Sequence, residues 1–452
     1  MSKYQAYPKY EPINAEWLSE IPIGWSTTPL KHVASINMGQ SPSSDDCNID
    51  GIGVPFLQGN AEFGVKSPTE KQFCPIPKKV AKAGDLLFSV RAPVGSLNFA
   101  NKDFGIGRGL CSIRGTNAIS QSFLWWVLPS YKYQFDAIAT GSTFEAVSAE
   151  EVGNLNLALP PILEQTQIAN FLDHETAKID TLIEKQQQLI KLLKEKRQAV
   201  ISHAVTKGLN PHAPMKDSGV EWLGEVPEHW GVLRLKHLIE SLESGVSVNA
   251  ADIPARTDEV GVLKTSCVYT CTFRAEENKT VVPEDLHRVK CPVRKGAIII
   301  SRMNTPELVG ASALVTEDVS NVYLPDRLWQ TNFNQKVDLD SEYLAHFMTV
   351  EGFRVQISLA AEGASSSMQN IAKEDYLSIN CLLPPLSEQQ QIVQHIRQRL
   401  EYFSKLDSNA NDAVSLLKER RTALISAAVT GKIDVRNWQA PTSQEQALEQ
   451  TA

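Results

Sequence analysis

Two stretches of the chain place hydrophobic residues at the spacing of a long amphipathic helix. Between residues 158 and 210, apolar side chains recur at intervals of three, four and seven positions, and the same heptad phase returns between residues 381 and 436. Each stretch begins just after a Pro-Pro pair and ends at a glycine, Gly208 or Gly431, which suits a left-handed helix cap. The pattern therefore predicts two long helices, the first from about residue 162 to about residue 206.

A heptad seam of apolar residues requires a partner helix along its length. Because the two stretches share a phase and neither has a second helix nearby in the sequence, we expect them to pair with each other. Packing of each helix on its own domain is the alternative. The residues predicted to pair the helices, or to dock a partner protein, are Ile179, Leu182, Leu189, Leu193, Val200, Phe403, Leu406, Leu417 and Leu424.

The segments between the predicted helices have a different pattern. Residues 80–90 and 293–302 each combine a turn with a short apolar strand, and many Gly, Pro, Asn and Ser residues interrupt the rest. This pattern is typical of mostly β structure with polar loops and a few helices. The expected fold class is α+β, with two globular, mostly β domains in tandem, each followed by a long helix. The predicted order is a first β domain (residues 1–157), a helix (158–210), a linker with a second β domain (211–380), a second helix (381–436) and a tail (437–452).

This order of elements reflects an internal repeat. Residues 17–25 recur, with most positions conserved, as residues 222–230, an offset of 205 positions. A second signature, which starts at Leu159, recurs 224 positions later, and this offset holds without a gap as far as Thr206. Matches in the same order in both halves exclude coincidence, so the chain is a tandem of two related parts, the second longer by 19 residues.

Length and composition limit the class of protein. With 452 residues, of which 42% are hydrophobic and 21% charged, the chain is long enough for roughly two to four packed domains and too apolar for general disorder. The sequence contains no run of 18 or more apolar residues, the length that a membrane-spanning helix needs. The polar, aromatic beginning lacks the apolar core of an export signal, so we expect a cytoplasmic protein. Seven scattered cysteines without a Cys-x-x-Cys pair are expected to be reduced thiols rather than zinc ligands.

The net charge limits the possible classes of function only in part. A net charge of −8 argues against a protein that coats nucleic acid by bulk electrostatics, but it allows a reader with a local basic face or a basic partner. Residues 12–157 carry 11 basic and 13 acidic side chains, whereas residues 216–380 carry 16 basic and 24 acidic ones. Because phosphate contacts supply most sequence-independent affinity, we expect the chain alone to bind DNA weakly.

The motifs of several enzyme classes are missing from the sequence. It contains no GxxxxGK[ST] loop, no GxGxxG turn after a strand, no HExxH metal motif and no Asn/Asp-Pro-Pro-Tyr/Phe element of adenine methyltransferases. The spacing of Glu277 and Lys279 is that of many nuclease cores, but no Pro-Asp partner precedes it. We therefore expect no catalytic residues and no metal site, which in a protein of two similar halves indicates recognition.

The second repeated signature has the form Leu-Pro-Pro-x-x-Glu-Gln-x-Gln-Ile. Together with the closing segment Ala-Val-Thr-Gly-Lys-Ile-Asp-Val-Arg at residues 428–436, it resembles the specificity subunit of type I restriction–modification systems. The resemblance covers nearly the whole chain. Further similar segments are residues 39–42, 54–59, 89–95, 221–230 and 261–264.

The resemblance implies a protein that reads double-stranded DNA with two target-recognition domains joined by an antiparallel helical spacer. In this family each domain reads one half of a split, asymmetric site. Two methyltransferase subunits attach and methylate an adenine in each half with S-adenosylmethionine, and restriction subunits, which are motor-nucleases, use ATP and Mg²⁺. The chain itself would then be a non-enzymatic subunit that binds none of these cofactors.

Base contacts require side chains that match the base edges: arginine for guanine, asparagine or glutamine for adenine, and serine or threonine for either. Such residues, with one lysine, occur in the polar loop segments of both domains. The candidates in the first domain are Gln40, Ser41, Gln58, Asn60, Arg91, Arg108, Ser142 and Thr143. The candidates in the second domain are Lys264, Arg302, Asn304, Ser365, Ser366 and Gln369. For each residue, an ordinary loop position or a structural hydrogen bond is the alternative.

Two other classes of function compete with this interpretation. A coiled-coil scaffold would organise other proteins without touching DNA, and DNA methylation would not depend on it. A self-contained enzyme acting on nucleic acid would show activity as the purified chain alone.

Overall fold

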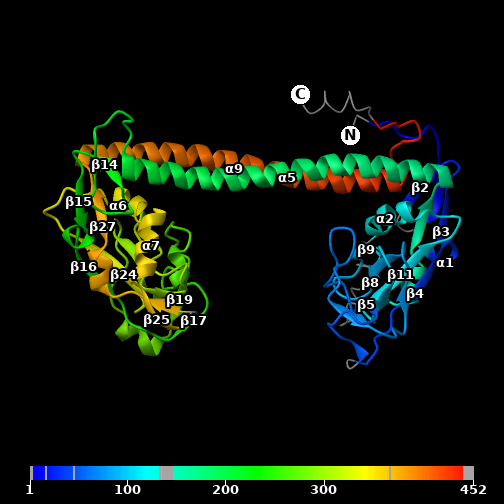
Figure 1. Cartoon of the computed structure of the whole chain (residues 1–452), viewed down its shortest axis with the longest axis horizontal. Coiled ribbons are helices and arrows are strands. Elements are labelled where there is room, and N and C mark those ends of the chain that lie inside the picture. Colours follow the sequence, from blue (N-terminus) through cyan, green and yellow to red (C-terminus); the bar gives the residue numbers. More distant parts are fainter. Residues whose placement is uncertain are drawn as a thin grey trace. The chain divides into compact units, whose positions relative to one another are not determined.

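The computed structural model describes residues 4–15, 18–43, 46–131, 134, 146–365 and 368–440. The chain divides into two compact units, Met1–Gln187 with Asn411–Ala452, and Gln188–Ala410. Each unit contains one mainly β domain and a part of each of two long helices, α5 (Ile162–Lys207) and α9 (Leu386–Val429) (Figure 1). The predicted fold class is therefore confirmed.

The first domain is built on two four-stranded sheets. Its strands are β1 (Tyr10–Ala15), β2 (Leu18–Pro22), β3 (Ser26–Pro29), β4 (Ala34–Met38), β5 (Val54–Leu57), β6 (Gln72–Cys74), β7 (Val80–Ala81), β8 (Leu86–Ser89), β9 (Leu97–Phe99), β10 (Phe104–Ile106), β11 (Leu110–Gly115) and β12 (Asn156–Leu159). Its helices are α1 (Leu30–Val33), α2 (Gln121–Ser130) and α4 (Ala149–Gly153). One sheet has the strand order β4-β11-β8-β9, and the other has the order β6-β5-β10-β7, in which β10 runs parallel to β5. The pairs β1-β2 and β12-β3 are separate two-stranded sheets.

The second domain repeats this plan, and the structure also describes a small three-stranded sheet in it. Its strands are β13 (Met215–Asp217), β14 (Glu225–Pro227), β15 (Gly231–Arg234), β16 (Ile239–Ser244), β17 (Ala250–Ala251), β18 (Gly261–Leu263), β19 (Asn278–Val281), β20 (Ile298–Ser301), β21 (Met303–Asn304), β22 (Ser312–Leu314), β23 (Val322–Tyr323), β24 (Leu328–Phe333), β25 (Glu362–Ser365), β26 (Met368–Asn370) and β27 (Asn380–Leu383). Its helices are η2 (Leu235–His237), η3 (Thr265–Val268), η4 (Pro283–Arg288), α6 (Ser341–Phe347), α7 (Glu351–Ala360) and α8 (Lys373–Ser378). The sheets have the orders β16-β24-β20-β22, β17-β19-β18-β23 and β21-β26-β25, with the pairs β13-β14 and β15-β27.

One central strand of each domain separates two hydrophobic cores. In β8, Leu86 and Phe88 pack into one core and Leu87 into another. The isoleucines Ile298–Ile300 of β20 repeat this alternation. Successive side chains of a strand point to opposite faces, so a short run of apolar residues can fill two cores at once. The internal repeat of the sequence is therefore also a repeat of packing.

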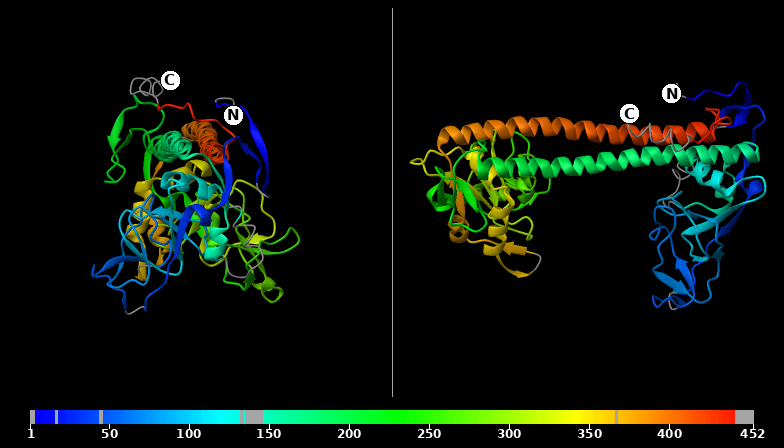
Figure 2. Two further views of the ribbon diagram at one scale, coloured as in Figure 1. Left: turned by 90° about the vertical axis from the view of Figure 1, so that its right-hand side faces the viewer. Right: turned by 45° about the horizontal axis from the view of Figure 1, so that its top comes forward.

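The long helices lie side by side in both units (Figures 1 and 2). In the first unit, Arg421 of α9 donates two hydrogen bonds to the carboxylate of Asp180 in α5, at 2.7 and 3.1 Å. In the second unit, Val200 near the end of α5 lines the same groove as Arg399 near the start of α9. The pairing of the two helices is thereby confirmed, and in each unit they run antiparallel.

The helix ends agree with the local sequence signals. Helix α5 has 46 residues and α9 has 44, which at about 1.5 Å per residue correspond to roughly 69 and 66 Å. Gly208 and Gly431 follow the helices with φ angles of +78° and +74°. A β-carbon on Gly431 would lie 2.5 Å from the ring of Pro22, so close packing as well as backbone conformation requires glycine here.

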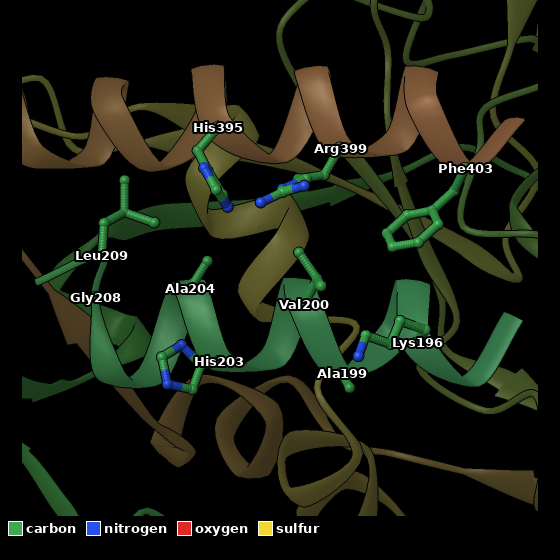
Figure 3. Close-up of a pocket in the computed structure, with 10 residues that line it drawn as sticks. All are labelled: Lys196, Ala199, Val200, His203, Ala204, Gly208, Leu209, His395, Arg399 and Phe403. Atoms are coloured by element: carbon green, nitrogen blue, oxygen red, sulfur yellow. The ribbon is translucent and has the colours of Figure 1, made fainter. Parts of the chain in front are cut away.

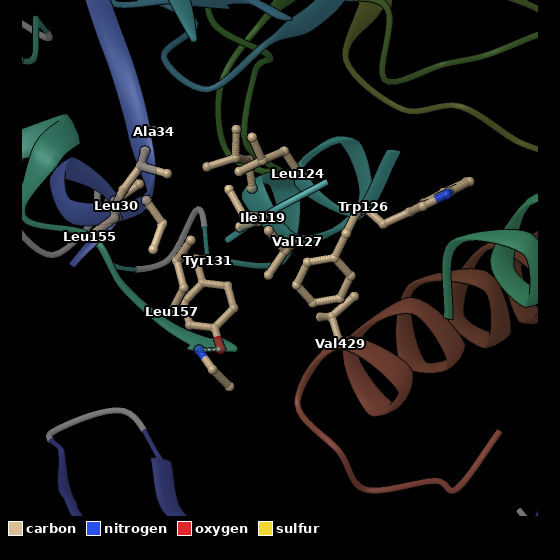
Figure 4. Close-up of a cluster of buried hydrophobic side chains, with 14 of the residues drawn as sticks. Leu30, Ala34, Ile119, Leu124, Trp126, Val127, Tyr131, Leu155, Leu157 and Val429 are labelled. Carbon is tan, nitrogen blue, oxygen red and sulfur yellow. Dashed lines mark hydrogen bonds between the residues drawn. The ribbon is translucent and has the colours of Figure 1, made fainter. Parts of the chain in front are cut away.

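The last turn of α9 belongs to the core of the first domain (Figure 4). Val429 is fully buried in the same cluster as Leu157 and Val127. Beside them, the hydroxyl of Tyr131 accepts a hydrogen bond from the main-chain N–H of Ala158 at 3.1 Å. The end of the second long helix is thus fixed on the first domain, more than 200 residues away in the sequence.

The glutamine of the repeated signature fixes the start of each long helix. Gln165 is fully buried; its Oε1 accepts from the main-chain N–H of Ser120, and its Nε2 donates to the carbonyls of Ala118 and Pro160, all at 2.8 to 2.9 Å. Gln389 makes the equivalent bonds to the main chain of Asp340, Asp338 and Pro384. Buried main-chain groups need such partners, so the glutamine secures the helix to the domain that precedes it.

The neighbouring glutamate joins the two repeated motifs. Glu164 accepts hydrogen bonds from the indole of Trp25 at 3.1 Å and from the hydroxyl of Tyr7. Glu388 accepts from the indole of Trp230 at 3.1 Å and lies 2.7 Å from Nε2 of His229. The segments around Trp25 and Trp230 thus recur because each holds the start of a long helix.

Candidate nucleic-acid interface and spacer helices

Four of the predicted DNA-contacting residues of the first domain come together from three separate loops. The hydroxyl of Ser41 and the amide of Gln58 are hydrogen-bonded at 2.8 to 3.0 Å, and the main-chain N–H of Arg108 donates to the Ser41 hydroxyl at 3.2 Å. Gln40 is held next to them through its main-chain N–H, which donates to the carbonyl of Ile106 at 2.8 Å. The Gln40, Gln58 and Arg108 side chains are exposed, so the cluster offers polar groups to solvent.

The loops of Arg91 and Asn60 adjoin this cluster. The main-chain N–H of Val90 donates to the carbonyl of Gly109 at 3.0 Å, which places Arg91 beside the loop of Arg108. Asn60 donates to the hydroxyl of Ser96 at 3.4 Å. Arg91 and Arg108 are both exposed, and neither forms an ion pair with another residue that the structure describes. Two arginines near exposed amide and hydroxyl groups can contact phosphates and base edges. The predicted Ser142 and Thr143 lie outside the described residues.

Three of the second-domain candidates lie on one face of a short ladder. Asn304 of β21 is directly opposite Gln369 of β26. Arg302, two residues before Asn304, accepts a main-chain hydrogen bond from Ile371 at 3.1 Å and continues this ladder. Because strand side chains alternate, Arg302, Asn304 and Gln369 point to the same side.

Two polar atoms of this ladder are buried without a hydrogen-bond partner among the residues that the structure describes. They are Nε of Arg302 and Oε1 of Gln369. A buried polar atom without a partner costs about 1–3 kcal/mol, so this ladder is a place where the fold leaves polar groups unsatisfied. Arginine and glutamine are the side chains that match guanine and adenine edges.

Sequence reasoning missed two residues of this site, Tyr269 and Thr265. The amide of Asn304 donates to the hydroxyl of Tyr269 at 2.7 Å, and the hydroxyls of Tyr269 and Thr265 are also 2.7 Å apart. These contacts orient the Asn304 side chain, and an aromatic residue with a polar loop on either side is the signal that could have pointed to Tyr269.

The remaining candidates of the second domain are less available for contacts with DNA. Lys264 forms an ion pair with Asp252 at 2.9 Å, and Lys279 lies 3.4 Å from the same carboxylate. The hydrogen bond from Lys264 is the main cause that lowers the pKa of Asp252 below its usual value. The positive charge of Lys264 is therefore largely balanced. Ser365 ends β25 opposite Met368, while its side chain, like the whole of Ser366, lies outside the described residues.

The predicted pairing residues occupy two different positions on the helices. Ile179 and Phe403 are buried, and the half-buried ones are Leu193, Val200, Leu406, Leu417 and Leu424. Leu182 and Leu189 are 47% and 42% exposed, because the helix turns their neighbours Ile183 and Ile190 inward instead. These two leucines are thus suited to docking a partner, the second role that the prediction left open.

A groove of about 540 Å³ lies between the helices in the second unit (Figure 3). Its apolar lining includes Val200, Ala204 and Phe403. Its basic lining residues are Lys196, His203, His395 and Arg399. None of the described residues that line it is acidic, so the groove suits a segment that carries negative charge.

The equivalent position in the first unit is filled by the chain's own termini. An offset of 224 relates His395 to Phe171 and Arg399 to Glu175. Trp438 packs edge-on against Phe171 with 5.5 Å between ring centroids, and Tyr4 does so at 5.1 Å. The hydroxyl of Tyr4 also donates to Glu175 at 2.8 Å. Aromatic side chains thus cover in one unit the position that is an open groove in the other.

The described residues contain no group of three or more His, Cys, Asp or Glu side chains that could hold a metal ion. In that same part of the chain, no helix is both long and apolar enough to cross a membrane.

Comparison with known proteins shows which family the chain resembles. Residues 22–192 match the family model described as the type I restriction modification DNA specificity domain. The EcoKI specificity subunit of Escherichia coli K12 is 22% identical over 446 residues, which cover 93% of this chain and 91% of that subunit. The chain therefore resembles type I specificity subunits over more than nine-tenths of its length, and residues 22–192 match the DNA specificity domain itself. The resemblance predicted from the repeated signature is therefore confirmed.

Other specificity proteins match parts of the chain or its fold. The putative MjaX specificity subunit of Methanocaldococcus jannaschii is 37% identical over 185 residues, but these span only 43% of that subunit and 40% of this chain. The HsdS subunit of Thermoanaerobacter tengcongensis has the same fold, with a TM-score of 0.52, 18% identity and coverage of 91% of this chain and 98% of that one. A chain from a study of assembly and conformational transition in a type I restriction–modification system gives a TM-score of 0.70 at 17% identity, over 91% of this chain and 99% of that one.

Proposed function

We propose that this specificity protein reads a split, asymmetric DNA site, with one half bound by each domain. The observation that carries the proposal is the repeated domain in which loop residues with base-matching side chains gather at one place. In the second domain, Arg302, Asn304 and Gln369 lie on one face of a ladder and have side chains of the types that match base edges. Since the loops of the two domains differ in sequence, the two half-sites need not be related.

We also propose that the chain does no chemistry itself and docks two methyltransferase subunits, which methylate adenine with S-adenosylmethionine. Restriction subunits would join the same complex and use ATP and Mg²⁺. The names of its relatives as specificity subunits of restriction enzymes support the assignment of the chemistry to other subunits.

The groove on the spacer helices is our proposed docking site for one methyltransferase subunit. The first unit shows what such a surface accepts, because Trp438 and Tyr4 cover the equivalent position there. The basic lining of the groove then favours a segment with an aromatic side chain next to carboxylates. Leu189, exposed on α5, extends the apolar area available to a partner.

The proposal is tested by mapping N6-methyladenine across the genome with and without this gene, using long-read sequencing. Deletion should remove methylation from one split motif. Complementation with Arg302→Ala should weaken or relax recognition of one half-site only, by about 1–3 kcal/mol per base contact. The matched control is Arg234→Ala, which removes an exposed arginine of β15 and should restore the wild-type motif.

An unchanged methylome after deletion would favour the scaffold function instead. Loss of both half-sites in the Arg302→Ala strain, with the protein still folded, would contradict the assignment of one half-site to each domain.

A further inference from the structure

Two cysteines of the first domain face each other across a pair of extended segments. Asn48 and Phe73 form an antiparallel bridge, with reciprocal main-chain hydrogen bonds of 2.9 and 2.8 Å. Cys47 precedes Asn48 and Cys74 follows Phe73, so the register places these two cysteines directly opposite each other. Next to a hydrogen-bonded pair comes a non-hydrogen-bonded pair, with Cα atoms about 4.5 Å apart. Disulfides accept Cα separations of about 4.4–6.8 Å, so a pair that continues this register lies within the range of a disulfide.

The side chains agree with the register. Among neighbouring groups, Cys74 acts most strongly on the Cys47 thiol, and both thiols are unoxidised in this structure. Cys74 is fully buried in β6, whereas Cys47 is partly exposed and open to a small reagent. Burial first, and then the neighbouring Cys74, raises the pKa of Cys47, so the thiol form prevails at neutral pH. At neutral pH Cys47 is therefore mostly a thiol, and its minor thiolate fraction is the form that reacts with an oxidant.

Other cysteines of the chain have different surroundings. Cys111, Cys267 and Cys381 are fully buried, and burial raises the pKa of each to about 12. Cys291 is partly exposed, and its thiol is 3.9 Å from the carboxylate of Glu243. It therefore offers a comparison for a thiol of similar exposure next to an acidic group.

We propose that Cys47 and Cys74 form a reversible disulfide when the protein meets a peroxide. The thiolate of Cys47 attacks one peroxide oxygen, which breaks the O–O bond and, with one proton, yields a sulfenic acid and water. The sulfur of Cys74 then attacks the sulfenic sulfur; the S–S bond forms, and the departing hydroxide takes the Cys74 proton as a second water. Two thiols are oxidised by two electrons and one hydrogen peroxide is reduced to two waters. A dithiol reverses the reaction by thiol–disulfide exchange.

The disulfide would close the segment from Cys47 to Cys74, which contains β5 and the candidate base-contacting residues Gln58 and Asn60. Closing a loop restricts the conformations open to the residues inside it. If the proposed DNA reading is correct, on which this step rests, oxidation should alter recognition of the first half-site and leave the second unchanged.

The test treats the full chain with hydrogen peroxide, blocks free thiols, digests without reductant and identifies linked peptides by mass spectrometry. We expect one peptide pair joined through Cys47 and Cys74, a loss of two titratable thiols, and full recovery with dithiothreitol. Cys47→Ser should abolish the link, whereas Cys291→Ser should leave it unchanged. Circular dichroism shows whether each variant is folded.

Irreversible oxidation of Cys47 without a link, or a link from Cys47 to another cysteine, would overturn the proposal, and so would an unchanged thiol count. None of these readouts involves DNA, so failure of the disulfide is distinguishable from failure of the DNA-reading function.

Discussion

At the scale of single residues, the repeated Glu-Gln pair acts through buried hydrogen bonds. The amide of Gln389 makes three bonds of 2.8 to 3.0 Å to main-chain groups of Asp338, Asp340 and Pro384, all before the start of α9. The carboxylate of Glu388 meanwhile binds Trp230. Each main-chain group left without a partner in the core costs about 1–3 kcal/mol, so one side chain carries a large share of the attachment.

Gln389→Ala should therefore lower the free energy of unfolding by about 2–4 kcal/mol, since it removes three bonds and leaves a small cavity. Urea unfolding of the full chain, followed by tryptophan fluorescence, measures the change. Gln391→Ala is the control, because this glutamine is exposed on the same helix and its loss should change stability by less than about 0.5 kcal/mol. Equal midpoints for the two variants would show that the amide bonds do not hold the helix.

At the scale of elements, α5 and α9 are about four times as long as an average globular helix of about 11–12 residues. Isolated helices gain most of their stability from packing of one face, and here each helix supplies the other with that face. The bidentate ion pair of Asp180 with Arg421 fixes the relative register of the helices in the first unit. In the proposed function, the helix pair sets the length of the unread gap between the two half-sites.

Duplicating residues 183–189 in α5 and 411–417 in α9 adds one heptad to each helix and keeps the seam in phase. The added length of about 10.5 Å corresponds to roughly three base pairs at about 3.4 Å each, so the unread gap should lengthen while both half-sites stay the same. Methylome mapping of cells with the altered gene measures the gap. The same gap in altered and native proteins would reject the ruler, while an insertion in one helix alone should break the pairing and abolish methylation.

At the scale of the whole molecule, the distribution of charge indicates that the residues that recognise the DNA sequence are not those that supply most of the affinity for DNA. The second domain segment, residues 216–380, has eight more acidic than basic side chains. The four basic residues of the spacer groove lie on the helices instead. Affinity for DNA that does not depend on sequence comes mostly from phosphate contacts with Lys and Arg. In the proposed function, partner subunits supply much of this affinity.

The isolated chain should bind its DNA site weakly at physiological salt, and added methyltransferase subunits should tighten binding by a factor on the order of ten or more. Fluorescence anisotropy with a labelled duplex measures both states. Arg399→Glu should reduce this gain, because it places a negative charge in the basic groove, whereas Lys336→Glu reverses an exposed charge elsewhere and should preserve it. Tight specific binding by the chain alone would contradict the proposed dependence on partners.

The sequence by itself determined the elements that depend on neighbouring residues. The Pro-Pro starts, the heptad spacing and the closing glycines located α5 and α9 to within a residue or so at the ends that were predicted. Helix signals are local, because hydrogen bonds and side-chain contacts join residues three or four positions apart. The internal repeat also predicted the tandem order of the two β domains and the family.

Only the tertiary structure decided which distant residues meet. The sequence could not distinguish Leu182 from Ile183 as the seam residue, because both are apolar and the partner helix selects one of them. It showed Trp25 and Glu164 as separate motifs, although they are bonded across 139 positions. The gathering of Ser41, Gln58 and Arg108, the opposition of Asn304 and Gln369, and the open groove at Arg399 likewise depend on contacts between segments far apart in the chain. Such contacts are set by packing of the whole fold, and no local spacing encodes them.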